Sequence, residues 1–285
     1  MEILPLKKAA VTTLIHLVNE IFEDYPLPVN WREEDFELDV RENAISWDDS
    51  FLLVEGSQPI GFLLLSERGH TARIDSMGVV RAQRGTGASE ILLQQALENL
   101  RWKNTKRLIL EVIETDPRAI RFYEKHGFSV VRDLLTLEIS TNPGITPRWH
   151  YRPITPRGIH ELAQMAQDIW HRKPNWQRQP ATLHDSQDRY SMEAIYVNRT
   201  GGSPIGYLVW GKGERGFFVV DSFVVDPAFE LVDIVHDCLL HVNAQTKSTV
   251  GTLANIPRED PLCQVFLQLG ARELFKQLEM EMCLH

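Results

Sequence analysis

The sequence predicts two copies of one mixed α/β domain in tandem, each with a mostly antiparallel sheet flanked by helices. The chain has 285 residues, which is enough for two domains with ordinary cores. Near its middle, residues 141–147 read TNPGITP, a composition that breaks both helix and strand. Short stretches on either side of this segment also resemble each other. We therefore expect domains at residues 1–140 and 148–285, joined by a linker at 141–147.

Three matches in the same order support the duplication. The stretch PIGFL at 59–63 recurs as PIGYL at 204–208, an offset of 145 residues. DSMGV at 75–79 recurs as DSFVV at 221–225, an offset of 146, and HGF at 126–128 faces LGA at 269–271, an offset of 143. Each match is short, but three at nearly one spacing predict two copies of one domain.

The first half of the first copy reads strand, helix, helix and hairpin. Residues 3–6 are a short apolar run, and residues 9–22 carry apolar side chains at helical spacing. A second helix is expected at 33–44. Residues 50–55 and 59–66 are rich in strand formers and flank a Gly-Ser turn, which predicts an antiparallel hairpin.

The second half alternates strands with helices. We expect strands at 72–80 and 106–113 and a helix between them at 89–100. A helix at 117–126 ends at a glycine that is suited to cap it, and a last strand follows at 130–139. Strands alternating with helices in this way indicate a layered α/β domain with a mixed sheet.

Composition and charge restrict the class of protein. The apolar content of 43% and charged content of 24% are those of a soluble globular protein. The net charge of −9 disfavours binding to nucleic acid or anionic lipid and is compatible with a cationic substrate. The three cysteines form no CxxC motif, and the histidines lack ligand spacing, so we expect no metal. The start MEILPLKKAA lacks a signal-peptide core, which favours a cytoplasmic protein with no membrane partner.

A small-residue stretch, RGTGAS at 84–89, lies where a predicted strand meets a predicted helix. Backbone N–H groups at a helix N-terminus are unpaired, and glycines let an anion such as a diphosphate reach them. The stretch is not a P-loop, because Ala88-Ser89 follows its last glycine. It is not the dinucleotide motif either, because Glu90 replaces the third glycine. An ordinary packing turn is the alternative.

Together with LEVIETDPRAIRFYEKHGF at 110–128, this stretch strongly resembles the GNAT family of N-acetyltransferases. The family's cofactor motif, (Gln/Arg)-x-x-Gly-x-(Gly/Ala), is matched by Arg84, Gly87 and Ser89. Two residues depart from the pattern, since Ser89 replaces Gly or Ala and Asp116 replaces Asn. The resemblance covers residues 1–140 closely and 148–285 only in outline.

The resemblance implies that acetyl-CoA binds where the strands ending near residues 79 and 113 part. Backbone groups of the first strand would pair with the pantetheine arm, and backbone amides of the glycine stretch would hold the diphosphate. The cofactor-binding residues implied in this way are Met77, Gly78, Val79, Arg84, Gly85, Thr86, Gly87, Ala88, Ser89, Asp116 and Tyr123.

The chemistry of acetyl transfer suggests roles for four side chains. A lysine-like amine has a pKa of about 10.4, so it must lose a proton before it attacks. The resemblance places Tyr123 near the sulfur, where a phenol can protonate the leaving thiolate; packing on a helix face is its alternative role. Asp75, Glu111 and Glu114 are candidate bases, and a water chain can replace all three.

The acceptor pocket and the second copy leave more alternatives open. The loop 23–31, with Asp24, Tyr25 and Trp31, can line an acceptor pocket or cover the core. In the second copy the stretch 230–235 contains no glycine, and Phe266 faces Tyr123 at the 143-residue offset. This copy is expected to be catalytically silent and to serve as a structural partner, a wall of the acceptor site or a regulatory ligand site. Trp170, Trp176 and Trp210 can line such a ligand site, although packing in the core is the default expectation for them.

These observations predict an enzyme that transfers acetyl from acetyl-CoA to a primary amine of a small molecule or peptide by direct attack. The first alternative is an acyl-CoA sensor that binds without turnover, and the second is transfer of a longer acyl group. The sequence contains no GxSxG motif, so it gives no sign of an enzyme with a covalent serine nucleophile. The oligomeric state is left open between a monomer and a homodimer.

Overall fold

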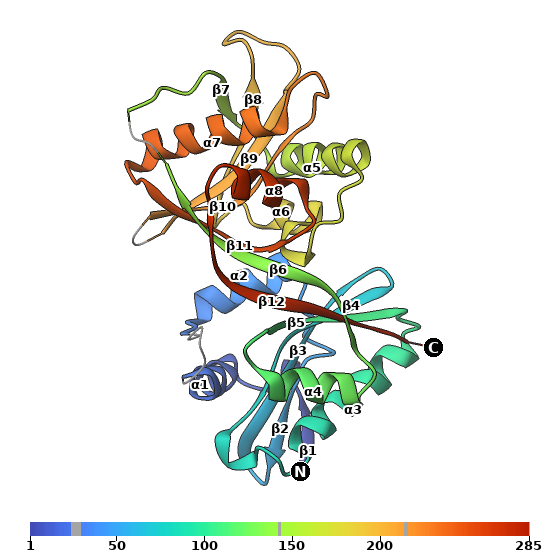
Figure 1. The fold of residues 1–285 in the computed structure, drawn as a ribbon. Coiled ribbons are helices and arrows are strands. Elements are labelled where there is room, and N and C mark those ends of the chain that lie inside the picture. Colours follow the sequence, from blue (N-terminus) through green and yellow to red (C-terminus); the bar gives the residue numbers. More distant parts are fainter. Residues whose placement is uncertain (24–29, 142–143, 214–215, 285) are drawn as a thin grey trace. The chain divides into compact units, whose positions relative to one another are not determined.

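The computed structural model describes residues 1–23, 30–141, 144–213 and 216–284 (Figure 1). Contacts within the chain divide it into two compact units. Unit 1 comprises Met1–Val131 together with Glu279–His285, and unit 2 comprises Arg132–Leu278. Each unit has a mixed sheet with helices packed on it, so the predicted fold class is confirmed.

From β1 to α4, unit 1 has the order of elements that the sequence predicts. Its elements are β1 (Glu2–Pro5), α1 (Val11–Phe22), α2 (Glu33–Asn43), β2 (Phe51–Glu55), β3 (Gln58–Arg68), β4 (Thr71–Val79), α3 (Ala88–Trp102), β5 (Arg107–Ile113) and α4 (Pro117–Lys125), with 3-10 turns η1 (Leu6–Lys8) and η2 (Arg81–Gln83). The strands lie in the order β1-β2-β3-β4-β5. Only β4 and β5 are parallel to each other among these pairs.

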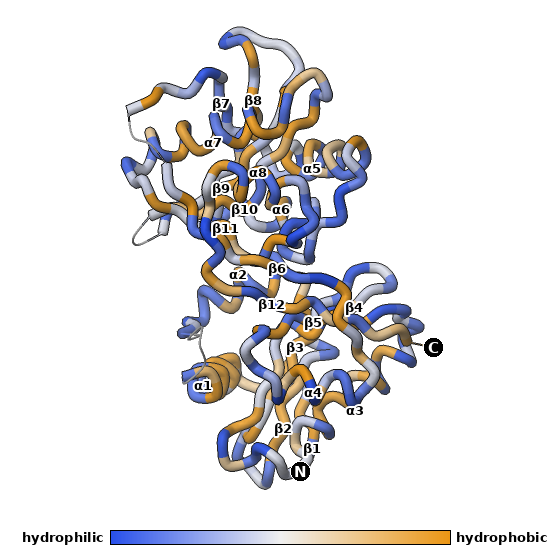
Figure 2. Tube along the Cα trace, in the orientation of Figure 1, coloured by the Kyte–Doolittle hydropathy of each residue, from blue (hydrophilic) through white to orange (hydrophobic). Residues whose placement is uncertain are grey.

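The core of unit 1 is formed by strands that are buried on both faces and by the apolar face of α1. The buried face of α1 carries Leu14, Val18 and Ile21, which cluster with Phe62 and Leu64 of β3. Coloured by hydropathy, β2, β3 and the inner side of α1 are mainly apolar (Figure 2). Burying these side chains is the main source of stability for the unit.

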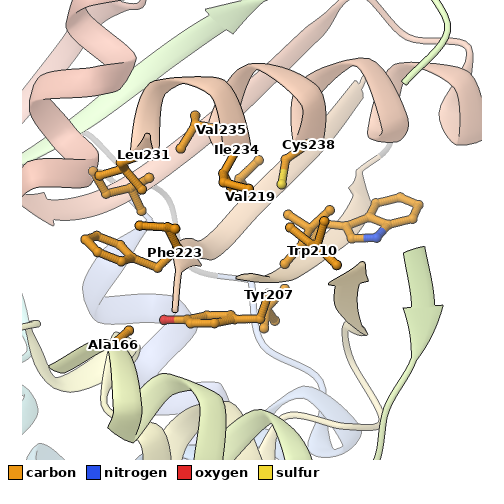
Figure 3. Packing of buried hydrophobic residues seen from close by; sticks show 14 of the residues in the cluster. Ala166, Tyr207, Trp210, Val219, Phe223, Leu231, Ile234, Val235 and Cys238 are labelled. Atoms are coloured by element: carbon orange, nitrogen blue, oxygen red, sulfur yellow. The ribbon is translucent and has the colours of Figure 1, made fainter. Parts of the chain in front are cut away.

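Unit 2 repeats the same order. Its elements are β6 (Ser129–Ser140), β7 (His150–Pro153), α5 (Pro156–Trp170), η3 (Trp176–Arg178), α6 (Pro180–Asp185), β8 (Ser191–Tyr196), β9 (Gly206–Gly213), β10 (Gly216–Val224), α7 (Leu231–Thr246), β11 (Val250–Pro257), α8 (Pro261–Gln268) and β12 (Arg272–Cys283). Figure 3 shows Ile234 and Cys238 of α7 on one side of the strands and Tyr207 with Ala166 on the other. Among the described residues no helix is long and apolar enough to cross a membrane.

Strand pairing gives the register of the repeat. Gly61 pairs with Val79 in unit 1, and Gly206 pairs with Val224 in unit 2, so the offset of 145 is confirmed for these strands. The offset of 146 for DSMGV is wrong by one residue, because Asp221 occupies the place of Ser76. Both strands bulge at the equivalent place, so the offset of 145 holds on either side of the bulge and the letter match at 146 is fortuitous.

The division by contacts lies elsewhere than the segment 141–147. Strand β6 pairs with β11 from Leu134↔Pro257 to Ser140↔Val250, so most of it belongs to unit 2. The last strand of unit 1 is supplied by the end of β12, where Leu284 N donates to the carbonyl of Lys106 at 2.8 Å. Proline and glycine mark where the chain turns, but strand pairing decides which unit a strand joins.

Candidate functional site

The parallel strands β4 and β5 form a fork. They pair from Thr71↔Arg107 to Ile74↔Leu110, while β4 continues to Val79 and β5 to Ile113. No ladder pair joins them beyond Ile74 in the described residues. The register of β4 against β3 shifts at Asp75, and a bulge of this kind bends a strand. Beyond it, residues 77–79 stay paired with β3 on one edge and face the opening of the fork with the other.

One of these residues, Gly78, has a packing role of its own. A Cβ atom on Gly78 would lie 2.6 Å from Cγ2 of Ile21, so only glycine lets α1 pack this closely on β4. Ile21 is itself part of the buried core of unit 1. The position of α1 over the fork therefore depends on a residue that the resemblance assigns to the cofactor.

Gly78→Ala is expected to destabilise unit 1 by about 1–3 kcal/mol through this overpacking. The measurement is urea denaturation of the intact protein, with Ile21→Ala and the double variant completing a cycle. In the double variant the added methyl group finds space, so its cost should fall by at least about 1 kcal/mol. If the free-energy costs of the two substitutions are strictly additive, the contact with Ile21 is not the reason why residue 78 must be glycine.

The glycine stretch lies at the start of α3, at the mouth of the fork. Gly85 and Gly87 have φ of +80° and +93°, and a Cβ on either would meet only open space. Gly87 is the N-cap of α3 and supplies no side-chain cap. Among the described residues no backbone acceptor is found for the N–H groups of Gly85 and Gly87. These groups point to a place where an anion can bind.

The neighbouring side chains brace this loop and leave its backbone open. Thr86 Oγ1 donates to the carbonyl of Gln83 at 2.9 Å, and Gln83 Nε2 donates to Glu55 at 3.2 Å. Arg84 is exposed beside the glycines and carries the positive charge nearest to them in sequence. The predicted diphosphate residues therefore lie on one short loop and in the first turn of α3 that follows it.

Helix α4 follows β5 and carries Tyr123. Asp116 caps its N-terminus, because one carboxylate oxygen accepts from the N–H groups of Arg118 at 3.2 Å and Ala119 at 3.1 Å. The Tyr123 ring is 9% exposed and lies 5.5 Å from the Phe128 ring, edge to face. Asp116 thus has a structural role that its replacement of Asn preserves. Whether either residue touches a cofactor stays a prediction.

Asp75 and Glu111 lie just past the last paired rung of the fork, on either side of Arg73. Arg73 forms an ion pair with Asp75 and lies 3.8 Å from Glu111, and the three side chains are at most 10% exposed. Burial by itself lowers the pKa of the Arg73 guanidinium, but Asp75 and Glu111 outweigh it and hold that pKa above its usual value. Arg73 therefore stays charged between the two candidate bases. Glu114, the third candidate, is exposed after β5.

Sequence reasoning missed Arg73, although a signal for it exists. An arginine inside an apolar strand, two residues before an aspartate, predicts a buried pair on one face of that strand. The sequence allows the loop 23–31 either to line an acceptor pocket or to cover the core, and Trp31 takes the second role. Trp31 packs on the core: its ring lies 5.4 Å from the Phe36 ring, and its backbone N–H donates to Asn19 Oδ1 at 2.8 Å. Asp24 and Tyr25 lie outside the described residues.

Unit 2 has lost both features of this site. The connection before α7, residues 225–230, is two residues shorter than residues 80–87 of unit 1, and its N-cap is Glu230 with φ of −79°. The glycine that ends α8, Gly270, has φ of +90°, close to the +95° of Gly127, and this match places Phe266 where unit 1 has Tyr123.

Core packing, the default expectation for Trp170, Trp176 and Trp210 of unit 2, is confirmed for two of them. Trp176 and Trp210 are buried in the core. Trp170 is partly exposed, and its Nε1 donates to the carbonyl of Val224 at 3.2 Å. The described residues contain no group of three or more His, Cys, Asp or Glu side chains that could hold a metal ion.

Comparisons with known proteins agree with this geometry. Residues 14–128 match the model of the acetyltransferase (GNAT) family. A tandem GNAT protein from the clavulanic acid biosynthesis pathway, solved without acetyl-CoA, is 17% identical, and the match covers 100% of this chain and 98% of that one with a TM-score of 0.73. No curated protein matched the sequence.

Two further solved structures resemble the whole chain. A GCN5-related N-acetyltransferase from Sphaerobacter thermophilus is 12% identical over 96% of this chain and 92% of its own, with a TM-score of 0.66. A putative acetyltransferase from Pyrococcus horikoshii is 13% identical over 95% and 85%, with a TM-score of 0.65. At these identities the likeness shows the fold. Residues 14–128 form a domain of the GNAT acetyltransferase family, and the chain as a whole has the tandem GNAT fold.

Proposed function

We propose that unit 1 transfers an acetyl group from acetyl-CoA to a primary amine by direct attack of the amine. The observation that carries this proposal is the fork between β4 and β5, with the open glycine loop at its mouth, inside the segment that matches the family. Acetyl-CoA supplies the activated acyl thioester. The fork offers the unpaired edge of β4 to its pantetheine arm, as an added strand would use it.

The glycine loop fits a diphosphate. The backbone of Gly85 and Gly87 lies just before and at the positive end of α3, and a Cβ at either position would meet only open space. Arg84 adds a charge-assisted contact. Asp116 keeps α4 in place by capping it, and α4 carries Tyr123 as the proton donor at its phenol oxygen.

The direct test measures thiol release from acetyl-CoA with a broad panel of primary amines, followed by mass spectrometry of the product. An acetylated amine formed only with intact protein supports the proposal. Acetyl-CoA binding without turnover of any amine would contradict it.

Tyr123→Phe is expected to lower kcat by about 10²–10⁴-fold, because the leaving thiolate loses its proton donor. The dissociation constant for acetyl-CoA should stay within about twofold, since binding is assigned to the fork and the glycine loop. Tyr196→Phe in unit 2, whose ring lies 4.5 Å from the Arg152 guanidinium, serves as the matched control. Equal losses in kcat and in acetyl-CoA affinity would assign Tyr123 a packing role instead.

An acyl-CoA-binding protein without turnover is the second candidate. It is favoured by one observation: Asp75 and Glu111, the two carboxylates at the fork, are both ion-pair partners of Arg73. Both carboxylates are therefore engaged by Arg73 and are not placed to take a proton from an amine directly. The enzyme then needs a water chain to deprotonate the amine, and the binding protein needs none. Turnover in the amine panel separates the two.

A further inference from the structure

In unit 2 the strands β10 and β11 form a second fork. Their parallel pairing consists of Phe217↔Gly251 and Phe218↔Thr252, while β10 continues to Val224 and β11 to Pro257. This fork has the same place in unit 2 that the β4–β5 fork has in unit 1. Residues 170–178, which begin at the last residue of α5, contact both strands of this fork, β10 and β11.

Two side chains of this segment hold the β10 arm. Trp170 Nε1 donates to the carbonyl of Val224 at 3.2 Å, which is the position equivalent to Val79 in unit 1. Arg172 donates to both carboxylate oxygens of Asp221, at 3.0 and 3.2 Å, and its guanidinium lies 3.9 Å from the centre of the Phe223 ring.

Two further groups contact the guanidinium of Arg172. Its guanidinium also donates to Asp260, the N-cap of α8, at 3.1 Å and to the Tyr207 hydroxyl at 3.2 Å. The side chains of Arg172, Asp221 and Asp260 are at most 1% exposed. Burial lowers the pKa of Arg172, but Asp221 and then Tyr207 and Asp260 reverse the effect and raise it. A charged group is buried this completely only where partners of opposite charge are fixed around it.

The β11 arm is held by Arg178. Its guanidinium donates to the carbonyl of Asn255 at 2.8 Å, to the carbonyl of Ala254, and to Asn175 Oδ1 at 3.1 Å. These carbonyls lie beyond the last paired rung of the fork, at a register shift of β11 where Asn255 has φ of +59°. Trp176, between the two arginines in sequence, is 1% exposed.

We propose that residues 170–178 are an internal ligand of unit 2. They close its fork by giving each arm the hydrogen bonds that an inserted molecule would give, and they are docked permanently. Unit 2 is then a closed structural copy and contains neither a vacant acyl-CoA site nor a lid over one. The inference rests on contacts within unit 2 and does not depend on the activity proposed for unit 1.

Limited trypsin digestion of the intact protein tests this, because Arg172 and Arg178 are potential cleavage sites inside the segment. Docked arginines should be cleaved at least about 100-fold more slowly than Arg199, which lies in an exposed turn. Saturating acetyl-CoA should not change the rates at either site. Cleavage as fast as at Arg199 would overturn the proposal, and so would protection of the segment by acetyl-CoA, which would make it a lid.

The variant Asp221→Asn/Asp260→Asn removes both charges that hold Arg172 and keeps the side-chain shapes; asparagine also remains a good N-cap for α8. Cleavage after Arg172 should rise by about 100-fold or more. Glu161→Gln, which removes a carboxylate from an exposed i,i+4 pair with Arg157, is the matched control and should change nothing. Unchanged cleavage in a folded double variant would overturn the proposal. If that variant does not fold, the wild-type rates with and without acetyl-CoA still decide.

Discussion

Gly87→Glu is expected to weaken binding of acetyl-CoA by at least about 100-fold. The new carboxylate would stand at the N-cap of α3, where the cofactor's diphosphate is assigned, and like charges a few ångströms apart at a protein surface repel by several kcal/mol. It would also offset the positive end of the helix. Equilibrium dialysis with labelled acetyl-CoA measures the loss.

Gly69→Glu is the matched control for this change. Gly69 has φ of +58° in the turn between β3 and β4, so the same substitution brings the same charge and a similar backbone strain. Gly69→Glu should bind acetyl-CoA as the wild type does. If Gly87→Glu also binds normally, the glycine loop is a packing turn, and the diphosphate must bind elsewhere.

Arg172→Met is expected to lower the free energy of unfolding of unit 2 by about 3–5 kcal/mol. The substitution leaves Asp221 and Asp260 buried without their shared cation, and an uncompensated buried charge is costly. Urea denaturation followed by tryptophan fluorescence reports on this unit through its buried Trp149, Trp176 and Trp210.

The control for this prediction is Arg157→Met, which removes an arginine from the surface of the same unit. Arg157 is 86% exposed and pairs with Glu161 one helical turn away, so its loss should cost no more than about 0.5 kcal/mol. A loss below about 1 kcal/mol for Arg172→Met would show that the buried ion cluster does not hold unit 2 together.

The order of elements in unit 1 could be predicted from the sequence because each element has a strong local signal. Apolar spacing marks α1, and Gly127 marks the end of α4. The exchange of strands between units could not be predicted. Strands β6 and β12 both mix apolar and polar residues, and the sequence of such a strand does not identify the strand with which it pairs. The pairing of β6 with β11 is therefore a result of the structure alone.

The candidate site was likewise predictable from the sequence only in part. The glycine loop and Tyr123 belong to contiguous motifs, so the sequence could locate them. The partnership of Arg73 with Asp75 and Glu111 joins two strands that are separated by helix α3, and only the fold brings it together. The ion cluster around Arg172 joins residues 49 and 88 positions apart in sequence, which no local pattern reveals.

We propose that unit 1 binds acetyl-CoA and that unit 2 is closed. Calorimetric titration of acetyl-CoA into the intact protein tests this most directly, because it counts the sites. We expect one equivalent bound in the wild type and none in Gly87→Glu. Two equivalents would show that the fork of unit 2 opens to ligand, and no binding would contradict the role assigned to the fork of unit 1.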